Sequence, residues 1–287
     1  MSLSLGIIFG LITLVCWGAA DFFAAKAVRK ADLFETLLWS QIISFICFLL
    51  LFFALFQLPI FTWETVKLLF IAGFLSALTF GTLYKGLKIG HVSVITPIVA
   101  CWSVVTAILS VIFLNEKLTG LQIAGIVFAI TGAILTSIKL EDLKKSKRAK
   151  LIMGIEYAII TAVAWGIGFT ITAVIVERLG WFLPMFFNKT IVVFYLLIYA
   201  GIARKKMAFP RQVILWILLI GILEAVAISA YGIGLTHEYS AVMAPISAAY
   251  PMVTIILARI FFRETLGMNQ KIGILAVIAG LVLLSLK

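Results

Sequence analysis

The sequence predicts an all-α integral membrane protein with ten transmembrane helices arranged as two inverted five-helix repeats. Of the 287 residues, 64% are hydrophobic and only 12% are charged, and the mean hydropathy is +1.21. Soluble domains are about half apolar and a quarter charged. The apolar residues form segments of about 20 residues, the length that a helix needs to cross roughly 30 Å of hydrocarbon. The two halves of the chain are also similar to each other at a fixed offset of 148 positions.

Ten apolar segments account for nearly the whole chain. They cover residues 4–25, 35–57, 66–86, 92–114, 121–138, 151–176, 181–203, 213–235, 240–262 and 271–286. Strands of a membrane barrel would show alternating polarity over about ten residues, and these segments do not. The longest polar stretch, residues 139–150, is interpreted as a basic linker between a first repeat, 1–138, and a second, 151–287. The function is therefore expected inside the membrane or at its faces.

The two repeats align without a gap when the chain is shifted by 148 positions. Trp17 falls on Trp165, Pro97 on Pro245 and Gly132 on Gly280. Each repeat contains five spans, an odd number, so the second repeat enters the membrane from the opposite side. Inverted repeats are a recurring architecture of secondary transporters, whose sites lie between the repeats. The first segment has a counterpart inside the chain and no basic start, so we interpret it as a membrane helix rather than a signal peptide.

Basic residues gather at the helix ends on one predicted face of the protein. That face holds the 139–150 linker and basic clusters near residues 26–30 and 204–211, whereas the other face holds only four basic residues. The positive-inside rule makes the first face cytoplasmic and places both termini outside, in a cytoplasmic membrane. The net charge of +11 does not indicate nucleic-acid binding, because no basic face carries interleaved aromatic residues.

Glu224 is the most deeply placed charge in the predicted spans. It lies roughly 16 Å from either end of its helix, and Lys189 lies about 12 Å inside the preceding one. The equivalent first-repeat residues are Ser76 and Gln41, so charge was added to one repeat only. A charge at the midplane is costly, so Glu224 is expected to face a cavity, to pair with Lys189 or to be protonated. A proton bound and released in each cycle would couple transport to a proton gradient, whereas a static pair would be structural.

Other candidate site residues are less distinctive. Asp21 either lines a cavity or pairs with Lys26 near the membrane surface. Pro251 lies inside the ninth span and is expected to bend it. Several aromatic residues are either interfacial anchors or core residues, or else the flat apolar walls of a small-molecule pocket. They are Trp17, Tyr84, Trp102, Trp165, Tyr231 and Tyr250.

Several motifs recur at the same place in each repeat. Each has a Trp-Gly in the first helix, a Pro in the fourth, a Glu just after the fourth (LNEKLT and FRETLG) and spaced glycines in the fifth. Together they resemble the EamA-type transporters of the drug/metabolite transporter superfamily. The resemblance implies a central cavity lined mainly by the first, third, fourth, sixth, eighth and ninth helices, which moves small metabolites or drugs. Many members carry an Arg early in the second helix, where this chain has Trp39-Ser40-Gln41, so a substrate role for that Arg does not carry over.

These observations predict a secondary active transporter. We expect it to move a small metabolite or drug, amino-acid-like or similar, by alternating access with proton coupling. The sequence lacks HExxH, GxSxG and GxxxxGK[ST] motifs, so no enzyme activity, cofactor or metal is expected. The expected partners are a small-molecule substrate and the lipid bilayer, with no nucleic acid, and the protein is either a monomer or a homodimer. The alternative is a polar-lipid-translocating or structural membrane protein.

Overall fold

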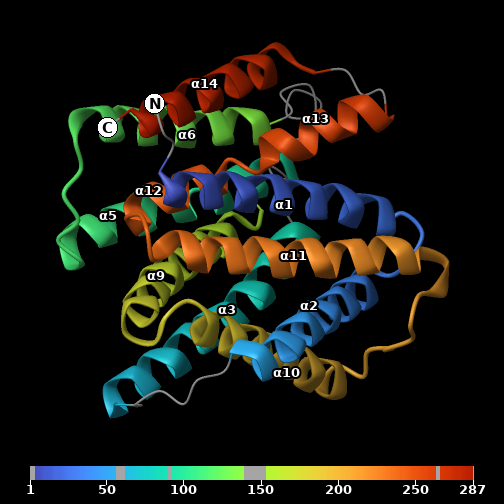
Figure 1. Cartoon of the computed structure of the whole chain (residues 1–287). Helices are drawn as coiled ribbons and strands as arrows, with labels where there is room; N and C mark the ends of the chain where they lie inside the picture. The colour runs from blue at the N-terminus through green and yellow to red at the C-terminus, as the bar shows by residue number, and fades with distance from the viewer. Residues whose placement is uncertain (1–3, 56–61, 90–91, 139–152, 263–265, 287) are drawn as a thin grey trace.

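The protein is a bundle of helices long and apolar enough to cross a membrane (Figure 1). The computed structural model describes residues 4–55, 62–89, 92–138, 153–262 and 266–286, and every regular element in these ranges is helical. The predicted linker, 139–150, lies outside the described residues. Ten candidate spans in the described part of the chain confirm the predicted fold class.

The described helices follow the same order in each repeat. The first repeat contains α1 (Leu5–Ala27), α2 (Leu33–Leu55), α3 (Trp63–Ile89), α4 (Val92–Ala100), α5 (Trp102–Phe113) and α6 (Gly120–Ser137). The second contains α9 (Ile155–Leu179), α10 (Phe182–Ile202), the 3₁₀ turn η1 (Arg211–Val213), α11 (Ile214–Leu235), α12 (Ser240–Ala248), α13 (Pro251–Phe262) and α14 (Met268–Ser285). Helix α1 begins and α14 ends at the same end of the bundle, on the left in Figure 1. The α1–α2 and α10–α11 connections lie at the opposite end.

The inverted symmetry is visible in contacts that occur twice. The Thr106 hydroxyl donates to the Gly166 carbonyl at 3.2 Å, and the Thr254 hydroxyl donates to the Gly18 carbonyl at 2.9 Å. Both donors and both acceptors are separated by 148 positions, so one bond is the image of the other. Each bond joins the broken fourth helix of one repeat to the first helix of the other.

The two fifth helices, α6 and α14, pack against each other through their glycines. A Cβ atom added to Gly132 would lie 2.6 Å from the Val277 nitrogen, and one added to Gly280 would lie 2.6 Å from the Ala129 nitrogen. Such distances leave no room for a side chain. Because lipid gives little hydrophobic drive for helix association, small residues that permit close backbone contact stabilise it. These glycines therefore hold the two repeats of one chain together.

The fourth helix of each repeat is broken in the middle. In the second repeat α12 ends at Ala248 and α13 begins at Pro251, which confirms the predicted bend. The span predicted over 92–114 is present as Val94–Phe113, but it is broken, because α4 ends at Ala100 and α5 begins at Trp102. At both breaks a backbone N–H donates three residues back, from Cys101 to Ile98 at 3.1 Å and from Ala249 to Ile246 at 3.3 Å. These bonds tighten the turn relative to an α-helix. The two turns occupy equivalent positions, although a proline follows only the second-repeat turn.

Candidate functional site

A cavity of about 310 Å³ lies between the two repeats. It extends from Trp102 and Met185, deep in the bundle, to Val28 and Leu33 beside the α1–α2 turn. Six helices supply most of its wall, namely α1, α2 and α3 from the first repeat and α9, α10 and α11 from the second. Trp102 and Tyr250 add the two helix breaks to the wall, so interrupted helices border the cavity, as they do in many transporters.

Most of the predicted site residues line this cavity. The structure brings together Trp17, Asp21, Trp102, Trp165, Lys189, Glu224 and Tyr250. Tyr231 lies elsewhere: it is fully buried and stacks on Trp17, with ring centroids 6.0 Å apart. It therefore packs behind Trp17 and does not itself line the cavity. Tyr84 belongs to α3, but its side chain lies outside the described part of the chain.

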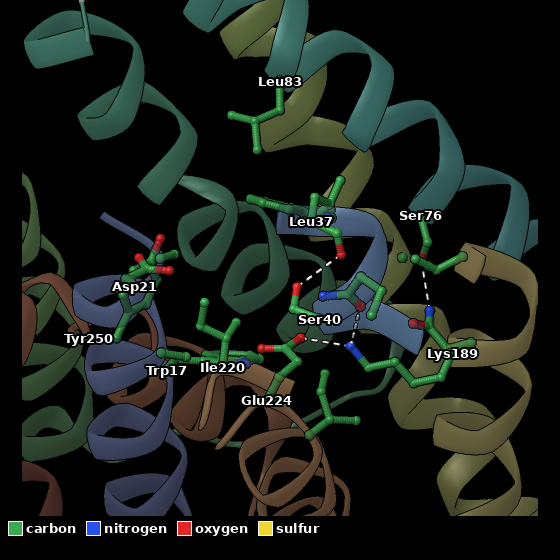
Figure 2. Close-up of a pocket in the computed structure, with 18 of the residues that line it drawn as sticks. Trp17, Asp21, Leu37, Ser40, Ser76, Leu83, Lys189, Ile220, Glu224 and Tyr250 are labelled. Atoms are coloured by element: carbon green, nitrogen blue, oxygen red, sulfur yellow. Dashed lines mark hydrogen bonds and ion pairs between the residues drawn. The ribbon is translucent and has the colours of Figure 1, made fainter. Parts of the chain in front are cut away.

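Lys189 makes two hydrogen bonds at the centre of the bundle, one to Glu224 within its own repeat and one to Gln41 across to the first repeat. Its Nζ lies 2.7 Å from Glu224 Oε1 and 2.9 Å from Gln41 Oε1 (Figure 2). The Lys189 side chain is only 3% exposed and that of Glu224 is 20% exposed, so the lysine depends on the carboxylate for neutralisation. A buried charge is tolerated when it is paired and hydrogen-bonded in this way. The sequence left a cavity position and a Lys189 partner open for Glu224, and the structure shows both.

A second polar contact lies beside this ion pair. The Asn188 side-chain amide donates to the Ser76 hydroxyl at 2.7 Å (Figure 2). Ser76 occupies the first-repeat position that is equivalent to Glu224, and Gln41 the one that is equivalent to Lys189. The polar network is therefore built on equivalent positions of α2, α3, α10 and α11, but only the second repeat supplies charges.

Asp21 lines the cavity apart from the Lys189–Glu224 pair. Its side chain is exposed on the cavity wall, and Figure 2 shows it near Tyr250, well away from Lys189. Lys26, the partner that the sequence left open, lies instead over the Trp216 ring at 5.1 Å and the Phe22 ring at 5.6 Å. Within the described ranges, the Asp21 carboxylate has no hydrogen-bond or ion-pair partner. Asp21 is thus the unpaired charge of the cavity wall.

Aromatic rings form the deep wall of the cavity next to Asp21. The Trp17 ring centroid lies 6.5 Å from that of Trp102, 6.2 Å from that of Phe169 and 6.1 Å from that of Tyr250. Trp102 and Phe169 are themselves 4.4 Å apart. Sequence reasoning missed Phe169, although a signal was present: it is the second-repeat equivalent of Asp21. The wall presents flat apolar surfaces to a ligand.

The two ends of the cavity differ. At the end where α1 begins, the Glu116 carboxylate accepts hydrogen bonds from the Ser240 and Ala241 N–H groups at 2.9 Å each and from the Ser240 hydroxyl at 3.0 Å. The Ser110 and Ser240 hydroxyls also bond to each other. Every residue of α12 is buried at this seal. The carboxylate caps the N-terminus of α12, where the helix dipole favours an anion.

The opposite end is not closed in the same way. Helices α4 and α13 are the equivalents of α12 and α5, and in their described residues they do not pack closely against each other. Glu264, the equivalent of Glu116, lies outside the described residues. The cavity extends toward this end, where Val28 and Leu33 are exposed. In the described residues, the cavity is therefore closed by packed helices at one end and extends toward the other.

Comparison with known proteins agrees with this architecture. The model of the EamA-like transporter family matches residues 4–138 and 152–286. An uncharacterized protein of Methanocaldococcus jannaschii, MJ1333.1, is 32% identical over 137 residues, which cover 46% of this chain and 96% of that protein. A solved crystal structure superposes with a TM-score of 0.81 at 14% identity over 99% of each chain, a likeness that concerns the fold alone. The chain belongs to the EamA-like transporter family.

Proposed function

We propose that this protein is a secondary active transporter that carries a small metabolite or drug, amino-acid-like or similar, across the cytoplasmic membrane by alternating access coupled to protons. The observation that carries the proposal is the cavity between the inverted repeats, sealed at one end by Glu116 and holding ionisable side chains at its centre. Membership of a transporter family supports transport rather than catalysis.

Alternating access would follow from an exchange of conformation between the repeats. The second repeat contributes α12 to the seal. The equivalent helix of the first repeat, α4, does not pack closely against α13. If each repeat adopted the other's conformation, the seal would move to the opposite end and the central cavity would open there. The basic α1–α2 and α10–α11 connections lie at the open end, so the positive-inside rule makes this an inward-open state.

Proton coupling is assigned to the Glu224–Lys189 pair. A proton that binds Glu224 would neutralise the carboxylate and remove the charge partner that lies 2.7 Å from Lys189 Nζ. Lys189 would retain the Gln41 oxygen as an acceptor but would be a buried, uncompensated cation. This state is costly, so protonation would favour a rearrangement of α10 and α11 about the cavity. Proton occupancy and conformation are thereby linked.

The test begins with a thermal-shift screen of the purified protein against amino acids, nucleosides, sugars and cationic drugs, because a ligand of the folded state raises its apparent stability. Hits are then added to proteoliposomes that contain a trapped pH-sensitive dye. We expect a substrate-dependent proton flux, and no flux from a variant carrying Lys189→Gln and Glu224→Ser. Substrate movement that ignores the pH gradient would refute coupling, and stabilisation by polar lipids alone would favour lipid translocation.

A further inference from the structure

We propose that Asp21 and the aromatic rings beside it form a subsite for a protonated amine on a ligand with a flat apolar body. The inference rests on the proposed function, because it takes the cavity between the repeats as the substrate site. It adds the chemical class of the substrate and the residue that recognises its charge.

The first argument is the charge of the cavity wall. Among the described lining residues, the acidic and basic side chains are Asp21, Lys189 and Glu224. Lys189 neutralises Glu224 at 2.7 Å, so the net charge is that of the unpartnered Asp21. In surroundings of low dielectric constant, an uncompensated carboxylate attracts a cation more strongly than it does in water. An amine-bearing ligand supplies that cation together with hydrogen-bond donors.

The second argument is the arrangement of the rings. Trp17 lies one turn before Asp21 on α1, and residues four apart share a helix face. Tyr250 meets the Trp17 ring edge-on, with an interplanar angle of 76° and 6.1 Å between centroids. Aromatic faces attract ammonium groups, and more so where water is excluded. Trp102 and Phe169 continue the wall and provide a surface on which a flat ring can stack.

The third argument concerns ligands that carry a carboxylate. Lys189 is the basic residue among the described lining residues, and it already donates to Glu224 and Gln41. A ligand carboxylate would have to compete with these partners and would lie in a cavity of net negative charge. The geometry therefore favours an amine over the amino acid with the same ring.

The test compares four ligands that share one indole ring. Tryptamine carries only the amine, indole-3-propionate only a carboxylate, tryptophan both, and tryptophol a neutral hydroxyl. Calorimetric titration of the purified full-length protein is expected to show the tightest binding for tryptamine. Tryptophol should bind roughly tenfold or more weakly, because a charge-assisted hydrogen bond is lost. This comparison needs no variant, so it remains decisive even if a substitution at Asp21 prevents folding.

Variants locate the effect. Asp21→Asn should weaken tryptamine binding by roughly tenfold or more and leave tryptophol unchanged, whereas Asp21→Glu should keep the preference for tryptamine. Asp32→Asn is the matched control: Asp32 is exposed at the start of α2, accepts from the Phe34 and Glu35 N–H groups, and lies outside the cavity wall. Asn caps a helix as well as Asp does, so tryptamine binding should not change.

The outcomes separate this inference from the proposed function. Equal affinity for tryptamine and tryptophol, or an unchanged tryptamine affinity in folded Asp21→Asn, overturns the amine subsite even if transport of another substrate is found. Tryptamine binding that depends on Asp21, without substrate flux in proteoliposomes, upholds the subsite and refutes transport. Preferential binding of indole-3-propionate would show that the site selects an anion, and it would overturn the assignment of Asp21 as the residue that recognises a cation.

Discussion

The two repeats are alike where helices meet and unlike where the cavity is lined. Thr106 and Thr254 make the same bond to the Gly166 and Gly18 carbonyls. At the cavity, equivalent positions carry different chemistry, as in Gln41 and Lys189, Ser76 and Glu224, and Asp21 and Phe169. Close helix approach constrains both repeats in the same way, whereas a single ligand needs each charge only once. Trp17 and Trp165 line the cavity from equivalent positions, but the charged residues of the site all stand at positions where the two repeats differ.

The largest effect is expected from removing one member of the asymmetric pair. Glu224→Gln leaves Lys189 buried with no charge partner, which should lower the free energy of unfolding by about 3–5 kcal/mol. Thermal unfolding in detergent measures the loss. The double variant Lys189→Gln with Glu224→Ser gives the second repeat the residues of the first and should regain most of the stability. A double variant as unstable as Glu224→Gln would show that the scaffold itself requires the ion pair.

An intermediate effect is expected at the seal. Glu116→Gln keeps one acceptor oxygen but loses the charge that caps α12, and a hydrogen bond to a charged group contributes about 1.5–3 kcal/mol. The equilibrium should shift toward an opening at this end. Alkylation of Ala241→Cys, in a background without Cys16, Cys47 and Cys101, should then be roughly tenfold faster with a membrane-impermeant maleimide, since about 1.4 kcal/mol corresponds to tenfold. An unchanged rate would exclude Glu116 from control of the seal.

The smallest effect is expected at the symmetric bonds. Thr106→Val and Thr254→Val each remove one hydroxyl that donates to a glycine carbonyl in the other repeat. Each should lower the free energy of unfolding by about 1 kcal/mol, and the two losses should agree. Thermal unfolding of both variants under the same conditions checks this. Clearly different losses in the two variants would show that the two equivalent bonds do not contribute equally to stability.

Hydropathy and the repeat were sufficient to predict the fold class and ten spans, because hydrocarbon imposes long apolar helices and the offset reveals the inversion. The break at Cys101 was not predictable in this way. The second-repeat break has Pro251 to mark it, but the equivalent first-repeat residue is Ser103. A tightened turn that depends on packing leaves no sign in hydropathy.

The site was predictable to the extent that its residues are unusual in a membrane. Glu224, Lys189 and Asp21 were candidates because charge in hydrocarbon requires a reason. Phe169 escaped notice because one more Phe in an apolar span is ordinary, and only its equivalence to Asp21 in the repeat distinguishes it. For Tyr231 the sequence left a core position and the cavity wall open, and the structure buries it behind Trp17. Sequence could not decide this, since a shift of one residue along a helix changes the face by about 100°. Such rotations are set by tertiary packing.

The bond between Lys189 and Gln41 joins equivalent positions of the two repeats. If the two repeats exchanged conformations, Lys189 and Gln41 would take each other's places. Their hydrogen bond could therefore persist in both states, at the point about which the helices move. The bond between Lys189 and Glu224 maps instead onto Gln41 and Ser76, a neutral pair. The two end states would then be related in shape but unequal in charge distribution. Under the proposed coupling, a proton would therefore act on the second repeat alone, although the two repeats are nearly symmetric in shape.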